Sequence, residues 1–446
     1  GGKTWKNVTP PQLPPGARIQ AIDPSPHRPG KAYVAAYRYL LDDWEPYIFR
    51  TEDYGKSWTR LTTGRNGIPA DWPTRVVRED PDREGLLYAG TEFGIFVSFD
   101  DGASWQSFQL NLPATPVTDM KVYRKDLVLA TMGRSFWILD NLTPLHQWND
   151  RVRAARAHLF EPRDTYRMRY FVAGGDPNAG TYPPPGATID YYLADAPAGE
   201  VTLEILDANG RLIRSFSSEP NTAAPTLPDG TGAPVAGLER AGTPRLPKKA
   251  GVNRFIWDLA HPGPWAPEPG RSGRGGPLAV PGTYQARLTV DGRSETRTFR
   301  VLVDPRVAED GVTQADLEEQ LALALKVRDM LGEARAAVVR LEKAREAIAA
   351  RQKAGGLDRK ASREVDQAMR ALDAIRERLV TADGAYPQPM LVDQIQYLYG
   401  MLNRADQKPG RDAHLRYDEL RAELDRNLAE LRRILDSGAV VAAGAR

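Results

Sequence analysis

Two carboxylates that could take part in sugar chemistry stand in separate segments of this chain, at Asp43 and Glu92. A pair of carboxyl groups can hydrolyse a glycosidic bond, with about 5 Å between them for retention of configuration or about 6.5–9.5 Å for inversion. Arginine and carboxylate side chains also bind sugar hydroxyl groups, and aromatic rings stack on sugar rings. The candidate ligand-binding residues chosen on this ground are Arg38, Asp42, Trp44 and Arg134.

The same residues have a plainer interpretation. Asp and Arg side chains often pair with each other to hold loops together, and a tryptophan can cover apolar surface at a sheet edge. Both interpretations stay open at this point.

Several classes of enzyme and of metal site are not indicated. The chain has no Gly-x-Ser-x-Gly elbow, no phosphate-binding loop and no His-Glu-x-x-His motif. Asp42-Asp43 and Asp100-Asp101 offer oxygen atoms of the kind that calcium prefers, but solvated turn carboxylates are the simpler interpretation. We expect no metal site, no cofactor and no histidine cluster, because the five histidines stand in different predicted elements, at His27, His146, His158, His261 and His414.

Length and composition set wider limits. The 446 residues are enough for about two to four domains. Lys and Arg number 60 against 58 for Asp and Glu, and this balance gives no indication of nucleic acid or an anionic membrane as partner. Cysteine is absent, so disulfides and thiolate metal sites are excluded. No apolar run reaches the length of a membrane span.

An eight-residue pattern, Ser/Thr-x-Asp-x-Gly-x-x-Trp, occurs at residues 51–58 and again at residues 98–105. A third, partial copy occupies residues 2–5. The Asp can accept hydrogen bonds from turn amides, the Gly allows a positive φ, and the Trp brings a large apolar ring into the next strand. We expect each copy to form a tight turn between antiparallel strands. The structural residues are Thr51, Asp53, Gly55, Trp58, Ser98, Asp100, Gly102 and Trp105.

The pattern resembles the Asp-box, or BNR repeat, of sialidases, xyloglucan-type endoglucanases and sortilin-like receptors. The stretches RVVREDPDREGLLYAGTEFGIFVSFDDGASW and DLVLATMGRSFWILDNLTPL look like a large bacterial group of sortilin-like Asp-box proteins, commonly labelled glycosyl hydrolases. This resemblance covers residues 1 to about 440. It implies a β-propeller with its ligand site on the face away from the Asp-boxes, an immunoglobulin-like module and a helical tail. It also implies an extracellular or periplasmic location.

The expected fold is multidomain, mainly β and then α. Short strands and turns in residues 1–147 predict the last blades of an Asp-box β-propeller, with four strands to a full blade. So few blades cannot close a ring, and we expect upstream blades in the natural protein. Strand order places three loops on the face away from the Asp-boxes, and they carry the candidate residues: 37–46, 91–93 and 131–134.

The rest of the chain predicts two further domains. Short strands and hairpin turns in residues 157–305 are typical of an immunoglobulin-like β-sandwich, interrupted by Pro/Gly-rich loops at 219–249 and 261–276. Residues 312–438 predict an antiparallel helical bundle, because apolar residues recur every three or four positions after a capping box at Thr313 and Asp316.

Three functions compete on this evidence. The first is a secreted or periplasmic propeller protein that binds glycan or peptide. The second is a glycoside hydrolase of the Asp-box propeller type, and the third is a structural part of a surface or secretion assembly. Binding ranks first, because the sequence supplies a scaffold without a complete catalytic set.

Overall fold

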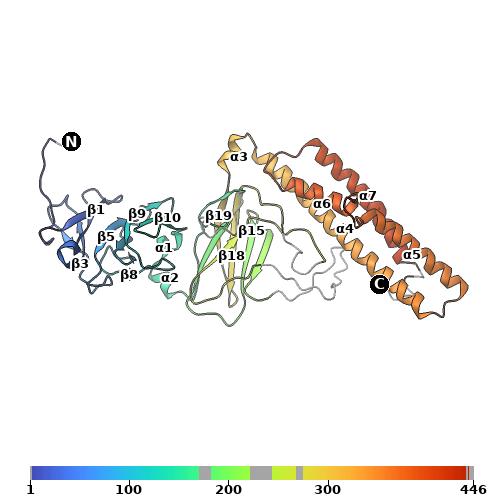
Figure 1. The fold of residues 1–446 in the computed structure, drawn as a ribbon, viewed down its shortest axis with the longest axis horizontal. Helices are drawn as coiled ribbons and strands as arrows, with labels where there is room; N and C mark the ends of the chain where they lie inside the picture. The colour runs from blue at the N-terminus through green and yellow to red at the C-terminus, as the bar shows by residue number, and fades with distance from the viewer. Residues whose placement is uncertain (1–2, 170–181, 221–243, 268–274, 438–439, 441–446) are drawn as a thin grey trace. The chain divides into compact units, whose positions relative to one another are not determined.

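The computed structural model describes residues 3–169, 182–220, 244–267, 275–437 and 440. Strands make up the first part of the chain and long helices the last part, so the expected order of mainly β and then α is confirmed (Figure 1). The chain divides into two compact units, Gly1–Asp150 and Arg151–Arg446. Part of each Pro/Gly-rich loop, and the first residue of the partial repeat, lie outside the described residues.

The first unit contains three antiparallel sheets, each built from strands that follow one another in the sequence. Runs of consecutive buried residues form the central strands of the first two sheets, whereas the strands of the third sheet alternate between more and less buried residues. The first sheet has the order β1 (Arg18–Pro24), β2 (Ala32–Arg38), β3 (Asp43–Thr51), β4 (Thr59–Arg60). The second has the order β5 (Thr74–Glu79), β6 (Leu87–Thr91), β7 (Ile95–Ser98), β8 (Gln106–Ser107). The third has the order β11 (Phe136–Leu139), β10 (Asp126–Thr131), β9 (Val117–Tyr123).

One apolar core joins these sheets. It includes Ile48 from the first sheet, Val77 from the second and Leu127 from the third. The helices α1 (Thr143–Gln147) and α2 (Asp150–Ala154) follow the last strand.

The two eight-residue patterns fold into turns with matching hydrogen bonds. In the first, Asp53 accepts bonds from the Thr51 hydroxyl at 3.0 Å and from the Ser57 amide at 2.9 Å. In the second, Asp100 accepts bonds from the Ser98 hydroxyl at 2.8 Å and from the Ser104 amide at 2.9 Å. The bonds from Ser57 hold the pKa of Asp53 at about 2. The sequence pattern therefore predicts the local geometry of both turns.

The connection between β2 and β3 is shorter than the ten-residue loop we expected. Residue 38 still belongs to β2 and residue 43 already belongs to β3, and the two pair across the hairpin. A single 3-10 turn, Tyr39–Leu41, joins them, and Asp42 closes it with a φ of 60°. The carboxylate of Asp43 attracts the guanidinium of Arg38 across the hairpin, so the ion pair extends both strands.

In the second unit, two sheets pack over a shared core. One has the order β12 (Ala157–Leu159), β14 (Ala187–Leu193), β17 (Gly251–Trp257). The other has the order β13 (Thr165–Arg167), β19 (Arg293–Val303), β18 (Gly282–Val290), β15 (Val201–Asp207), β16 (Leu212–Ser217). Ile189 and Trp257 from the first sheet meet Leu203 and Phe299 from the second in this core.

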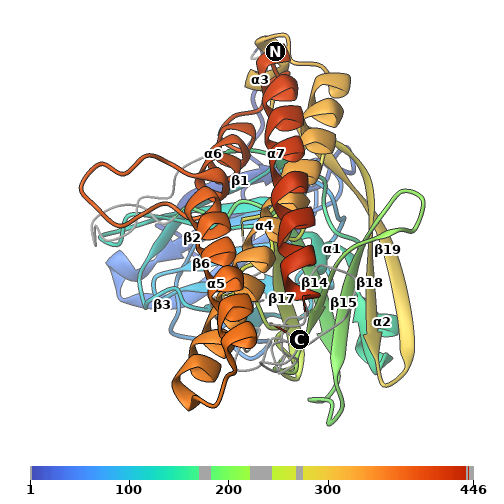
Figure 2. The same ribbon diagram turned by 90° about the vertical axis from the view of Figure 1, so that its right-hand side faces the viewer.

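Helices follow the sheets: α3 (Pro305–Glu309), α4 (Gln314–Ala354), α5 (Arg359–Leu379), α6 (Leu391–Leu402) and α7 (Arg411–Leu435). The capping box at Thr313 and Asp316 is confirmed, and Gly355 follows the last residue of α4. The apolar stripes of α4 to α7 form a single core, and the helices lie along one another in Figures 1 and 2. No helix among the described residues is both long and apolar enough to cross a membrane.

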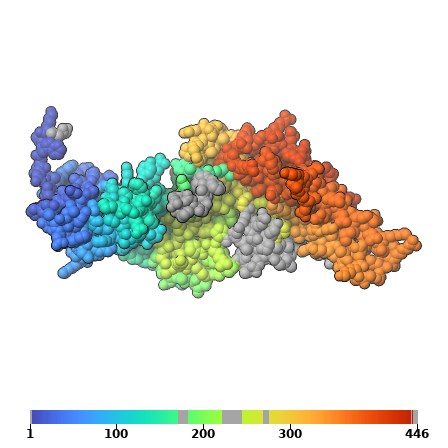
Figure 3. All heavy atoms as spheres, in the orientation of Figure 1, coloured from blue at the N-terminus to red at the C-terminus, as the bar shows by residue number. Residues whose placement is uncertain are grey.

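A buried ion cluster connects the sheets of the second unit to its helices. Arg167, the last residue of β13, lies 2.7 Å from the carboxylate of Asp406 between α6 and α7, and both side chains are almost fully buried. Arg169 binds the same oxygen at 2.7 Å and also donates to the carbonyl of Asn403. Figure 3 shows the heavy atoms of the whole chain as spheres, coloured by residue number.

The burial of the repeat tryptophans generates the first prediction. Trp105 is only 4 % exposed, whereas Trp58 is partly exposed. We expect Trp105→Ala to lower the unfolding free energy by about 3–5 kcal/mol, as for other buried aromatic residues. Trp58→Ala should cost clearly less. Thermal unfolding of the intact chain checks this order, and equal losses for the two variants would contradict it.

Candidate functional site

A cluster of aromatic and charged side chains lies where the connections β2–β3 and β6–β7 approach each other. Arg75, near the start of β5, is at its centre. Its guanidinium binds Glu92 at 2.5 Å and the hydroxyl of Tyr39 at 2.8 Å. It also lies over the ring of Tyr37, 4.7 Å from the centroid, and this ring stacks on Tyr39. One arginine thus joins the first sheet to the second.

The cluster is at the opposite end of the sheets from the eight-residue turns. In the first sheet, the β2–β3 connection precedes β3, and the turn at residues 51–58 follows it. The expected separation of the candidate loops from the repeat turns therefore agrees with the strand order.

Asp43 is held in place by neighbours of its own hairpin. Its carboxylate binds the guanidinium of Arg38 at 3.1 Å and the hydroxyl of Tyr47 at 2.8 Å. Burial by itself would raise the pKa of Asp43, but hydrogen bonds from Tyr47, the Glu45 amide and Arg38 outweigh it and lower the pKa. This carboxyl group is therefore ionised at neutral pH, which suits a fixed acceptor and not a general acid.

The other candidates differ in their surroundings. Trp44 is 43 % exposed and its ring centroid lies 5.8 Å from that of Tyr39. Asp42 is exposed next to it. Arg134 is exposed on the β10–β11 connection, and its side chain makes no hydrogen bond or ion pair with any described residue. Contacts thus link Trp44 and Glu92 through Tyr39 and Arg75, but no such chain of contacts reaches Arg134.

The structure adds aromatic residues that the sequence analysis did not single out. Phe93 follows Glu92 and is partly exposed, and its ring lies 5.2 Å from that of Trp72. The amide of Glu92 donates to the carbonyl of Pro73, which connects the two segments. We call Tyr39, Trp44, Trp72 and Phe93 the aromatic surface. The sequence signal that could have identified Trp72 is its position two residues before β5, at the same end of the sheets as the candidate loops.

A second polar network lies at the other end, beside the eight-residue turns. Lys31 binds Glu79 at 3.1 Å and Asp101 at 3.2 Å, and the side chains of Lys31 and Glu79 are buried. Arg50 reaches Asp101 at 2.5 Å, and the Tyr33 hydroxyl contacts both acids. The interpretation of Asp101 as a solvated turn carboxylate is wrong, because Asp101 takes part in the contact between the first and second sheets.

A third cluster corrects the expectation that the histidines stay apart. His146 binds the buried carboxylate of Asp80 at 2.9 Å, and a ring nitrogen of His27 lies 2.8 Å from the Asp80 carbonyl oxygen. Asp80, Asp82 and His146 could each offer a ligand atom to a metal ion, all within 4.8 Å of one another. Asp80 already accepts bonds from His146, Tyr88 and the Asp82 amide, so hydrogen bonding alone accounts for the arrangement.

The sequence matches no protein-family model and no curated protein. Among the solved structures that show a limited likeness are two GH74 enzymes. One is a GH74 enzyme from Niastella koreensis, with a TM-score of 0.23 and 10 % identity, over 64 % of this chain and 46 % of the enzyme. The other is a GH74 xyloglucanase from Xanthomonas campestris, with a TM-score of 0.22 and 12 % identity, over 64 % of this chain and 38 % of the enzyme. The chain thus spans less than half of either enzyme, and these scores do not define a shared fold.

The Asp80 cluster generates a prediction of pH dependence. Burial would raise the pKa of Asp80, but the hydrogen bonds from His146, the Asp82 amide and Tyr88 lower it below the ordinary value of 3.8. A lowered pKa stabilises the fold above the unfolded-state pKa, and this contribution is lost as the pH falls through the folded-state pKa. We expect Asp80→Asn to lower the thermal midpoint at pH 7 and to lose this effect progressively below pH 3.8.

The exposed Asp82 provides the matched control, since its carboxylate accepts no hydrogen bond from any described residue. Asp82→Asn should therefore change the midpoint little at either pH. A difference between Asp80→Asn and the natural protein that stays constant down to about pH 3 would contradict the assignment.

Proposed function

We propose that this chain is a secreted or periplasmic β-propeller protein that binds glycan through the aromatic surface. The observation that carries the proposal is the grouping of partly exposed rings around the Arg75–Glu92 pair. Such rings offer faces on which sugars stack, and the fixed charges beside them offer bonds to hydroxyl groups. Arg38, Asp42 and Asp43 extend the polar rim, and Arg134 stays a candidate on the third sheet.

Repeated contacts between successive sheets support the propeller part of this proposal. The ring nitrogen of Trp105 donates to the carbonyl of Leu61 at 3.1 Å, and that of Trp58 donates to the carbonyl of Val8 at 2.8 Å. Gly102 abuts Leu61 in the same way as Gly55 abuts Val8. Residues 5–10 thus pack against the first sheet in the same way as β4 and Leu61 pack against the second sheet.

The faces of the sheets agree with this repetition. Val77 in β5 is fully buried, whereas Ile22, at the equivalent position of β1, is 65 % exposed. A further sheet of the same kind would cover Ile22, as blades cover one another in a propeller. The proposed domains are a propeller part at residues 1–147, an immunoglobulin-like sandwich at 157–305 and an antiparallel helical bundle at 312–438.

The state of the two candidate carboxylates favours binding over glycoside hydrolysis. Hydrolysis needs one carboxyl group that is protonated near neutral pH. Asp43 has a lowered pKa, and Glu92 is paired with Arg75 at 2.5 Å. In this geometry, both carboxylates hold neighbouring side chains in place.

The exposed ring of Trp44 gives the first test of this function. We expect Trp44→Ala to weaken binding of a glycan selected from an array of neutral oligosaccharides by at least about fivefold, because stacking on one ring is worth on the order of 1 kcal/mol. Trp5→Ala is the control, since Trp5 is 90 % exposed and lies on a different segment. Equal binding by both variants, or a preference for peptides on a peptide array, would contradict glycan binding at this surface.

A second test separates binding from catalysis. We expect the intact protein to release no reducing ends from the glycan that it binds, and Glu92→Gln to lower affinity because Arg75 loses its partner. Reducing-end release that Glu92→Gln or Asp43→Asn abolishes would instead support the glycoside hydrolase.

A further inference from the structure

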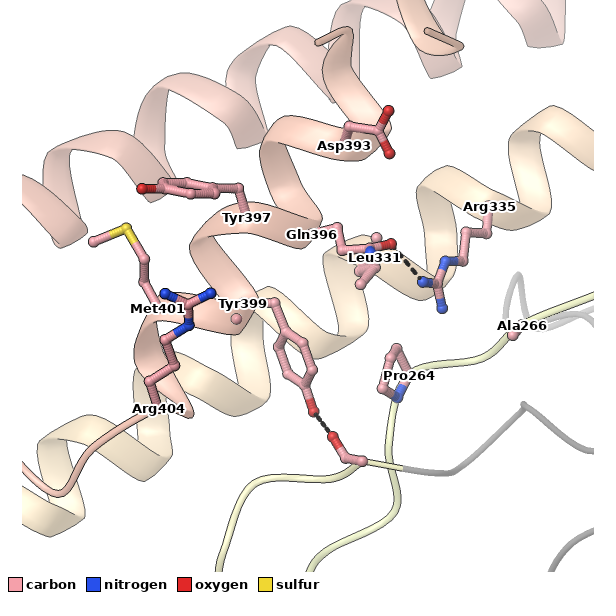
Figure 4. Close-up of a pocket in the computed structure, with 12 residues that line it drawn as sticks. Pro264, Ala266, Leu331, Arg335, Asp393, Gln396, Tyr397, Tyr399, Met401 and Arg404 are labelled. Carbon is pink, nitrogen blue, oxygen red and sulfur yellow. Dashed lines mark hydrogen bonds between the residues drawn. The ribbon is translucent and has the colours of Figure 1, made fainter. Parts of the chain in front are cut away.

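A pocket of about 660 Å³ opens in the second unit, between α4, α6 and the segment that includes Pro264 and Ala266. Figure 4 shows Arg335 on α4 and Arg404 after α6 on either side of Tyr399. Its volume lies within the range of about 300–1,000 Å³ that small-molecule sites occupy.

Hydrogen bonds connect the walls of this pocket to one another. The Tyr399 hydroxyl donates to the carbonyl of Gly275 at 2.5 Å, and burial raises the pKa of Tyr399 to about 12. Arg335 donates to the carbonyl of Trp265 at 3.2 Å and to the amide oxygen of Gln396 at 2.9 Å. These hydrogen bonds fix α4, α6 and the segment that includes Pro264 and Ala266 relative to one another around the opening.

The charges in the pocket favour an anion. Arg404 is exposed, and its side chain makes no hydrogen bond or ion pair with any described residue. Asp393, the carboxylate among the lining residues, accepts a bond from the hydroxyl of Thr381. A planar guanidinium with its donors free is well suited to a carboxylate, which it can bind through two parallel hydrogen bonds.

The remaining lining groups favour a sugar that carries this carboxylate. Tyr397 is 69 % exposed and offers a ring face. Gln396 and Asp393 offer oxygen acceptors for hydroxyl groups, which the side chains of an acidic peptide lack. We propose that the pocket binds the uronic acid residues of an acidic oligosaccharide, with Arg404 on the carboxylate. This site is separate from the aromatic surface and does not depend on it.

The experiment measures binding of trigalacturonate to the intact chain by calorimetry. We expect saturable binding that Arg404→Gln weakens about tenfold or more, since a charge-assisted hydrogen bond is lost. Arg433→Gln is the matched control, because Arg433 is an exposed arginine of α7 outside the pocket, and it should bind normally.

A second variant fills the pocket without touching its charges. A Cβ atom at Gly400 would meet no heavy atom within 4 Å, so a larger side chain fits there. Gly400→Leu should abolish binding while leaving the thermal midpoint unchanged or higher, because leucine favours a helix more than glycine does.

Three ligands and one further variant make the outcome decisive. Fully methyl-esterified trigalacturonate keeps the sugar rings without the charge, and hexaglutamate keeps charge without the rings; both should bind at least about tenfold more weakly. Trp44→Ala should leave trigalacturonate binding unchanged, which distinguishes this site from the aromatic surface. Absence of saturable trigalacturonate binding, equal binding of either analogue, or full binding by Gly400→Leu would each overturn the proposal.

Discussion

The first unit depends on a group of charges buried between its first two sheets. Lys31 at the start of the β2 hairpin meets Glu79 at the end of β5, and both side chains are removed from water. Removing one partner of such a pair typically costs about 3–5 kcal/mol, because the other charge stays buried. The pair therefore fixes how β5 lies against the first sheet. Arg75 stands at the other end of the same strand, and this fixed position brings it within reach of Tyr39.

Much of this fold could be predicted from local sequence patterns. The longer strands follow from short apolar runs bounded by turn residues, both eight-residue turns from the repeated pattern, and the helices α4 to α7 from helical stripes. Each of these signals acts over a few positions. β12 and β13 have three residues each, too few for a pattern to show. The β2–β3 hairpin was predicted as a loop, because the ion pair between Arg38 and Asp43 that extends its strands depends on cross-strand geometry.

The candidate site also depends on contacts between distant residues, which local sequence patterns do not reveal. Residue type and strand order indicated Trp44 and Glu92, and the structure connects them through Tyr39 and Arg75. Arg75 could not be chosen in advance, since it stands among buried strand residues and its partners are 36 and 17 positions away in the sequence. The same holds for Asp101 and His146, whose partners come from other segments of the chain. Sequence patterns identify surfaces well, but they do not identify charge partners.

The contact between Arg167 and Asp406 has a consequence for how the second unit can be divided. Arg167 also donates to the carbonyls of Leu278 and Ala279, so its guanidinium is bound from the sheet side and from the helix side. A recombinant sandwich that ended before α3 would lose Asp406 and with it the ion pair that joins the two parts of this unit. The two parts are therefore best treated as one cooperative folding block.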